Sequence, residues 1–314
     1  LEAEPETLAL ARRQAAAVAS VAQERVFAEL KRIVVGESAL AGLELMDELG
    51  VTAAILPELV ALRGVEQNRY HHADVHTHTM EVLEYTIALQ ADPGAVLGEE
   101  HASEVRALLA EPLADDLDRA GVMRLGALLH DAAKPTTLGH RDDGSPTFYG
   151  HDREGAQLAR DVLTRLRTSE KLKAHVAALV RNHLRLGFLV HEAPLSPRAL
   201  YRYMRACEPV EVDVTLLSVA DRLATRGRKA QEAIAKHVEV ARDALPAALA
   251  WRAHGPRTPL LPGDKLAAAL ALEPGPEVGR LLEAIDEAHY AGEIDSREEA
   301  IELASRLLAD GAAR

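Results

Sequence analysis

Apolar residues in this sequence recur mostly at intervals of three and four positions, which is the spacing of one face of an α-helix. Between Glu6 and Arg32 they follow one such face, and this predicts a single long amphipathic helix that Gly36 ends. The strict alternation that marks a half-buried strand persists nowhere. Aromatic residues make up only 3% of the chain, which also favours packed helices over sheets. We therefore expect an all-α protein.

The same spacing predicts further helices along the rest of the chain, over residues 118–131, 152–166, 170–184, 210–224, 228–252, 264–272, 277–291 and 296–309. Residues 99–118 are acidic and are expected to pack poorly, whereas 135–150 form a loop long enough to cover a site. We expect three parts: a helical neck at 1–64, a central domain at 65–253 and a small helical tail at 254–314.

One helical run ends on two adjacent groups that can bind a metal. The apolar stretch 125–129 is followed by His130 and Asp131, then by Lys134 and by Pro135, which stops the helix. An imidazole nitrogen beside a carboxylate readily binds a divalent cation. Alone, however, such a pair is better explained as a capped helix end with a core histidine. The interpretation needs support from other segments.

Four further segments each place one histidine or aspartate on an inward face, namely His78, His151, His183 and Asp221. His78 is predicted to face inward because it shares an apolar stripe with Val75 and Val82. The nearby His71, His72 and His76 lie off this stripe and are expected at the surface. The sequence thus gathers several candidate metal ligands from distant positions.

This series resembles the H…HD…H…H…D signature of the HD superfamily of metal-dependent phosphohydrolases. Several other runs resemble the neck, HD and body regions of the bacterial tRNA nucleotidyltransferase / poly(A) polymerase family. They are residues 24–30, 56–59, Gln67, 74–79, 275–282, 292–294 and 297–300. The similarity extends over nearly the whole chain. It makes the central part an HD domain and assigns the neck and the tail to the family's RNA-holding regions.

The resemblance implies that one divalent cation is held by His78, His130, Asp131 and Asp221, and a second by His151 and His183 with Asp131 shared. Mixed imidazole and carboxylate ligands suit Mn, Fe, Co, Ni, Zn or Mg, and the sequence does not choose among them. In such a site a metal-bridging hydroxide attacks phosphorus. Asp131 and Lys134 are therefore the expected catalytic residues, although Lys134 is equally well explained as an ordinary lysine at a helix C-terminus.

The net charge and its distribution limit the kinds of partner that the protein is expected to bind. The net charge of −13 argues against broad nonspecific binding of nucleic acid, because Lys and Arg supply most of the affinity for phosphate. Two local groups run against this trend: Arg198, Arg202 and Arg205, and then Arg222, Arg226, Arg228 and Lys229. They form either solvated helix faces or a positive rim for an RNA end or a phosphorylated nucleotide. The expected substrate-binding residues are Lys134, Arg153, Arg185 and Arg222.

The cellular setting is expected to be the cytoplasm. The single cysteine, Cys207, fits a reducing compartment. The sequence shows no leader peptide and no apolar run of membrane-spanning length, so no membrane partner is expected. The oligomeric state is left open.

Two functions fit these residues. The first is a phosphohydrolase, a phosphodiesterase or phosphatase acting on nucleotide or RNA-end phosphates such as 2′,3′-cyclic or 2′- or 3′-phosphates. The second is a non-catalytic, tRNA-binding neck and body of a tRNA nucleotidyltransferase.

The tRNA nucleotidyltransferase family carries a paired-aspartate motif on a strand of an N-terminal head, and we find no such stretch here. Asp142 and Asp143 lie in a turn-rich loop, so transferase activity by this chain alone is not expected. A nucleoside-triphosphate hydrolase of another HD branch is disfavoured by the neck and tail.

Overall fold

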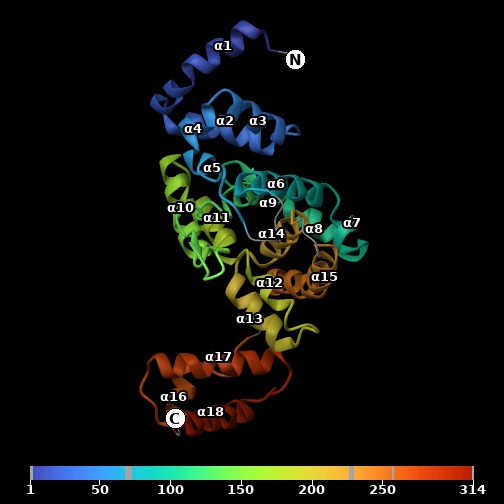
Figure 1. The fold of residues 1–314 in the computed structure, drawn as a ribbon. Helices are drawn as coiled ribbons and strands as arrows, with labels where there is room; N and C mark the ends of the chain where they lie inside the picture. The colour runs from blue at the N-terminus through green and yellow to red at the C-terminus, as the bar shows by residue number, and fades with distance from the viewer. Residues whose placement is uncertain (1–2, 68–72, 226–229, 257, 313–314) are drawn as a thin grey trace.

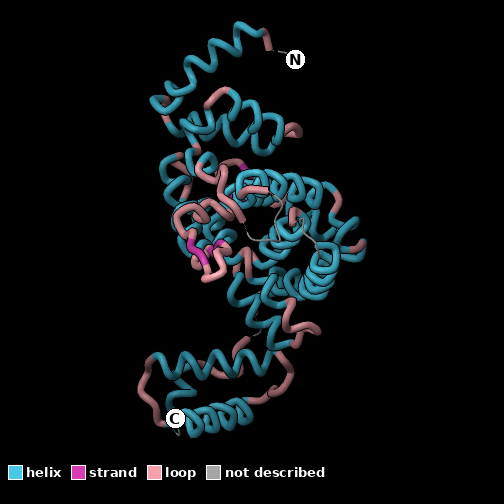
Figure 2. The backbone as a smooth tube through the Cα atoms, in the orientation of Figure 1, coloured by secondary structure: helices cyan, strands magenta, loops and turns pink. Residues whose placement is uncertain are grey.

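The structure, a computed structural model, describes residues 3–67, 73–225, 230–256 and 258–312. These residues form an all-α protein, as predicted, in which the neck, the central helices and the tail follow one another along an elongated molecule with its termini at opposite ends (Figure 1). The strands that the described residues contain make two short antiparallel hairpins (Figure 2). Within the described ranges no helix combines the length and the apolar character needed to cross a membrane.

The neck begins differently from the prediction. The expected single helix over 6–32 is wrong, because the chain forms α1 (Pro5–Gln14), the 3₁₀ helix η1 (Ala15–Ser20) and α2 (Gln23–Val35). The Ser20 hydroxyl donates a hydrogen bond to the Ala17 carbonyl at 2.7 Å, and Val21 is extended, so the helix breaks between these residues. Helices α3 (Ala39–Glu48), α4 (Val51–Ile55) and α5 (Pro57–Val60) complete the neck.

Two helices of the central region are buried on nearly all sides by the helices around them. The elements of this region are α6 (Val75–Ala91), α7 (Pro93–Leu97), η2 (Glu99–His101), α8 (Ala102–Leu109), β1 (Pro112–Ala114), β2 (Leu117–Asp118), α9 (Arg119–Leu129), β3 (Gly139–His140), β4 (Pro146–Thr147), α10 (His151–Arg165), α11 (Glu170–Asn182), α12 (Arg185–Leu189), α13 (Pro197–Cys207), α14 (Glu211–Leu223) and α15 (Ala230–His254). Almost every residue of α9 and α14 is buried. Both helices therefore pack against neighbours on all sides, which fixes the positions of their polar residues.

The acidic stretch 99–118 packs better than expected. Helix α8 buries Ala102, Val105, Leu108 and Leu109 against the central core, and β1 pairs with β2 directly before α9. The expectation of a poorly packed excursion is therefore wrong, because apolar residues at helical spacing separate the acidic ones.

The buried apolar side chains form two groups among the described residues. One runs without a break from the neck through the central helices, from Val26 to Trp251, and the other joins the three tail helices. The tail consists of α16 (Gly263–Leu270), α17 (Pro276–Tyr290) and α18 (Arg297–Ala312). Neck and centre thus share one core. The proposed boundaries at residues 64 and 253 stay a prediction.

Contacts between α13 and α17 attach the tail to the centre. Arg198 pairs with Glu293 at 2.6 Å, and Arg202 pairs with Glu287 at 2.7 Å. The Tyr290 ring of α17 lies 5.5 Å from the Tyr201 ring, centroid to centroid. The arginines of α13 are therefore engaged by carboxylates instead of forming an open rim. The second basic group lies largely outside the described residues, as do His71 and His72.

A buried ion pair joins the first turns of α9 and α14. The Nε of Arg119 donates to both carboxylate oxygens of Asp213 at 3.0 Å, and its Nη2 donates to the Pro209 carbonyl at 3.1 Å. Arg119 is 2% exposed and Asp213 is fully buried. A carboxylate at such a position needs a partner, because water does not solvate it.

Replacing Arg119 should therefore destabilise the fold strongly. We expect Arg119→Met to lower the free energy of unfolding by about 3–5 kcal/mol, since it leaves Asp213 buried without its cation. Urea denaturation measures this change. The double variant Arg119→Met/Asp213→Leu should recover part of the loss. The control Arg32→Met, which breaks an exposed pair with Glu29, should cost about 1 kcal/mol or less. Equal losses in the two single variants would contradict the prediction.

Candidate metal centre

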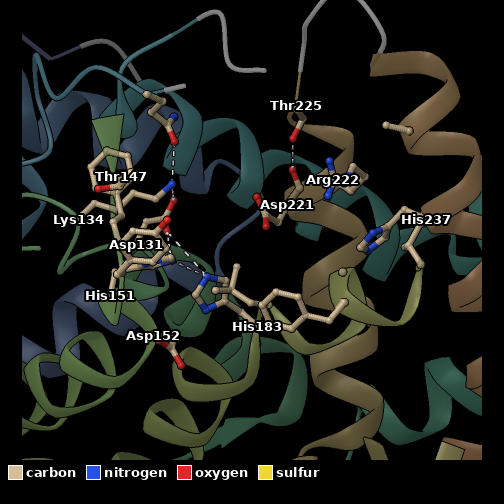
Figure 3. Close-up of a pocket in the computed structure, with 18 of the residues that line it drawn as sticks. Asp131, Lys134, Thr147, His151, Asp152, His183, Asp221, Arg222, Thr225 and His237 are labelled. Atoms are coloured by element: carbon tan, nitrogen blue, oxygen red, sulfur yellow. Dashed lines mark hydrogen bonds and ion pairs between the residues drawn. The ribbon is translucent and has the colours of Figure 1, made fainter. Parts of the chain in front are cut away.

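Six predicted ligands converge from five segments of the central helices. His78 lies in the first turn of α6, and Asp221 lies near the end of α14. His130 caps the C-terminus of α9 and is followed by Asp131, His183 caps α11, and His151 opens α10. Figure 3 shows the labelled residues of this set around one cavity. His78 is 1% exposed, so its predicted inward orientation is confirmed.

The ligand atoms fall into two groups. In each group the ligand atoms all lie within 4.8 Å of one another, and the groups are His78, His130 and Asp221, and Asp131, His151 and His183. In the first group the Nε2 of His78 is 3.0 Å from Oδ1 of Asp221. In the second group the Nε2 atoms of His151 and His183 are 3.3 Å apart.

Asp131 faces both groups with its two oxygens. Its Oδ2 is 3.1 Å from Nε2 of His130 and 3.8 Å from Nε2 of His78. Its Oδ1 is 3.4 Å from Nε2 of His151 and 3.9 Å from Nε2 of His183. The carboxylate of Asp131 can therefore bind a metal ion held by either group.

Backbone carbonyls orient three of the histidines. The Nδ1 atoms of His130, His151 and His183 lie 2.6–2.8 Å from the carbonyl oxygen three residues earlier, in each case within or next to a helix end. A carbonyl can only accept, so each Nδ1 carries a proton, and a ring without a second proton presents the lone pair of Nε2 inward. A carbonyl bonded to the outer nitrogen is also the usual support of a metal-ligating histidine.

The charges of these groups suit a cation. Burial and the neighbouring His130 lower the pKa of His183 to about 3, so its ring stays neutral. Burial would raise the pKa of Asp131, but His130 and Lys134 hold it well below its usual range. The facing Nε2 lone pairs of His151 and His183 repel one another unless something positive lies between them. This donor set therefore fits divalent metal binding.

Four of the ligands, Asp131, His151, His183 and Asp221, line a cavity of about 970 Å³. Lys134 and Arg222, two of the predicted substrate-binding residues, line it, and so does the loop 135–150 through the hairpin of β3 and β4. Arg153 and Arg185 are exposed and are not among the described residues that line it. Each lies two positions beyond a histidine ligand, which places it on another side of the chain. Their role in substrate binding stays a prediction.

Lys134 is held at the edge of the ligand cluster. Its Nζ lies 2.6 Å from Oδ2 of Asp131 and donates to Oε1 of Gln67 at 2.7 Å (Figure 3). It also lies 5.4 Å from the centroid of the Phe148 ring. A lysine that merely caps a helix would extend into solvent, whereas this one is 8% exposed and faces the cavity.

The sequence did not identify several residues of the cavity wall, namely Arg141, Phe148, Tyr149, Phe188, Lys236 and His237. His237 comes from α15 and hydrogen-bonds to Ser218 of α14 at 3.1 Å. No local pattern marked it, because only the packing of α15 on α14 brings it to the cavity. Phe148 and Tyr149 lie three and two positions before His151, and that closeness in the sequence was the available signal.

Comparison with known proteins shows which proteins the chain is similar to. The family described as the probable RNA and SrmB-binding site of polymerase A matches residues 1–62, and the HD domain matches residues 75–226. The CC-adding tRNA nucleotidyltransferase of Thermus thermophilus is 34% identical over 282 residues, which cover 89% of this chain and 55% of the relative. Over its neck, HD and body regions the chain is homologous to tRNA nucleotidyltransferases.

Other members of the tRNA nucleotidyltransferase family match over the same region. The A-adding tRNA nucleotidyltransferase of Deinococcus radiodurans is 31% identical over 280 residues, which cover 89% of this chain and 57% of the relative. The multifunctional CCA protein of Paracidovorax citrulli is 30% identical over 233 residues, or 71% of this chain and 47% of the relative. The chain spans about half the length of the curated relatives it matches. The predicted resemblance to the neck, HD and body regions is confirmed.

Metal binding should stabilise the folded protein. A ligand at 100 times its dissociation constant stabilises the state that binds it by about 2.7 kcal/mol. We expect Mn²⁺ or Zn²⁺ to raise the melting temperature of the wild type but not that of Asp131→Asn. The control Asp152→Asn should keep the response, because Asp152 pairs with Arg181 and belongs to neither ligand group. An unchanged melting temperature of the wild type with every metal would refute the site.

Proposed function

We propose that this chain is a metal-dependent phosphohydrolase acting on nucleotide or RNA-end phosphates, such as 2′,3′-cyclic or 2′- or 3′-phosphates. The observation that carries the proposal is the position of Asp131, which belongs to one ligand group, faces the histidines of the other with its Oδ2 and lines the cavity. A single structural metal would not require two complete groups, nor a cavity beside them.

The proposal assigns two ions to the two groups, with Asp131 shared by both. When bound, divalent cations lower the pKa of a water molecule and neutralise charge on an attacked phosphate. His151 and His183 remain neutral ligands because burial lowers the pKa of each ring. The carbonyl that each Nδ1 binds keeps the ring in one orientation.

Lys134 and Arg222 supply positive charge to a phosphate in the cavity. The Nζ of Lys134 is anchored by Asp131 and Gln67, so it can donate a hydrogen bond to a phosphate oxygen or a proton to the leaving oxygen. Arg222 follows Asp221 on α14 and lies between Asp221 and His237 in Figure 3. The substrate phosphate is thus flanked by cations from α14 and from the end of α9.

Hydrolysis of 2′,3′-cyclic AMP across Mn, Ni, Co and Mg tests this function. We expect metal-dependent turnover that Asp131→Ala abolishes, because that variant removes a ligand of both groups. Lys134→Met should lower kcat by about a hundredfold, the usual contribution of a positioned acid. The control Asp161→Asn, an exposed residue of α10, should retain wild-type turnover. Absence of turnover with every metal in folded, metal-loaded protein would exclude the proposed hydrolysis.

A second candidate function is RNA binding without catalysis. The match of residues 1–62 to an RNA-binding family and the tRNA nucleotidyltransferase relatives favour it. In this proposal the neck at 1–64 and the tail at 254–314 hold a tRNA at either end of the central domain at 65–253. The two functions are compatible, because the described residues that line the cavity, from Gln67 to His237, belong to neither the neck nor the tail.

Titration with tRNA at physiological salt tests the second function. We expect binding that weakens as salt rises, because contacts to phosphates release counterions. An unrelated protein of similar net charge serves as the control, and a minihelix of the acceptor stem serves as a competitor. If tRNA binds no more tightly than it binds the control protein, the RNA-holding role is excluded.

A further inference from the structure

Two exposed aromatic rings stand at the cavity of the metal centre. Among the large hydrophobic side chains of the described residues, Tyr149 is 77% exposed and Phe188 is 65% exposed, and both line this cavity. Exposed rings of this size are costly in water, and aromatic residues are scarce in this chain, which has only 3 phenylalanines. Their concentration at one cavity therefore calls for an explanation.

The backbone places each ring close to a ligand. Tyr149 is separated from His151 by Gly150, whose φ of +82° lets the chain turn sharply before α10 begins. Tyr149 can therefore face solvent while His151, two residues later, faces the ligand cluster. Phe188 lies in α12, which begins two residues after His183. Each ring thus belongs to a segment that also carries a histidine of the second ligand group.

Neither ring serves the packing of the protein. Phe148, next to Tyr149, is partly buried, and its ring lies near Lys134, whereas Tyr149 extends away from the core. In α12 the apolar contacts are made by Leu186 and Leu189, while Phe188 points outward. Replacing either exposed ring should consequently leave the fold intact.

A molecule that binds in this cavity beside the two rings must have a flat apolar face and a phosphate within reach of the metal ligands. A nucleobase on a phosphorylated ribose has both, since its ring stacks on aromatic side chains while the sugar carries the phosphate into the cavity. Positive charge from Lys134 and Arg222 in the same cavity fits the phosphate. A lipid tail or an apolar peptide could pack against the rings, but it would offer no negative charge to Lys134 and Arg222.

We propose that Tyr149 and Phe188 form a stacking site for the base of the nucleotide whose phosphate is hydrolysed, so that the cavity selects nucleotides over phosphoesters that lack a base. This inference rests on the proposed phosphohydrolase function. It makes the two rings specificity-determining residues and assigns them no part in the chemical step.

The test compares two substrates that differ only in the base, namely 2′,3′-cyclic AMP and methyl riboside 2,3-cyclic phosphate. We expect Phe188→Ala and Tyr149→Ala each to raise KM for the nucleotide about tenfold, within the range measured for loss of one stacked base. Neither variant should alter kcat, nor KM for the substrate without a base. Phe188→Tyr and Tyr149→Phe keep a ring and should restore the nucleotide KM. Leu45→Ala, an exposed apolar residue of α3, is the control.

A binding measurement separates this inference from the hydrolytic function. Calorimetric titration with adenosine 3′-phosphate and with methyl riboside 3-phosphate does not depend on turnover. Weaker binding of the nucleotide alone by both alanine variants would support stacking even if no substrate were hydrolysed. Equal losses for both ligands, or no loss for either, would overturn the inference. A dinucleotide with the same cyclic end distinguishes a strand end from a free nucleotide by its lower KM.

Discussion

A carboxylate that is only 2% exposed, such as that of Asp131, is stable in a protein interior only when positive or hydrogen-bonding groups surround it. Asp131 meets this demand with Lys134, whose Nζ lies 2.6 Å from Oδ2, and with the place for a cation that the surrounding imidazole nitrogens create. The helix ends that deliver these groups meet at the same point, because α9 and α11 end there and α10 begins there. The arrangement of α9, α10 and α11 around the cavity follows from that requirement, and so does the depth of the ligand cluster.

Helix ends are well suited to this task. The last carbonyls of a helix have no intrahelical partner, and at α9 and α11 these carbonyls bind the Nδ1 atoms of His130 and His183. The same contact satisfies a backbone group and aims the opposite nitrogen at the cluster. The Arg119–Asp213 pair at the other end of α9 fixes that helix against α14, which carries Asp221.

The sequence predicted the all-α fold and the inward position of His78. Both follow from the periodicity of the apolar residues. The break at Ser20 was missed because the residues before it are good helix formers. The cavity positions of Lys236 and His237 depend on how distant helices pack, which no local pattern encodes. Adjacency to a ligand does not fix exposure, since Arg153 is exposed two positions after the buried His151, and its role in substrate binding stays a prediction.

The ion pairs that Arg198 and Arg202 of α13 form with carboxylates of the tail have a consequence for any nucleic acid partner. Arg198 and Arg202 are bound to Glu293 and Glu287, so their charges are already neutralised within a chain of net charge −13. An RNA phosphate at this surface would have to displace a carboxylate from its own guanidinium. RNA and the tail carboxylates would therefore compete for the same guanidinium groups, whereas the packing of Tyr290 against Tyr201 does not depend on them.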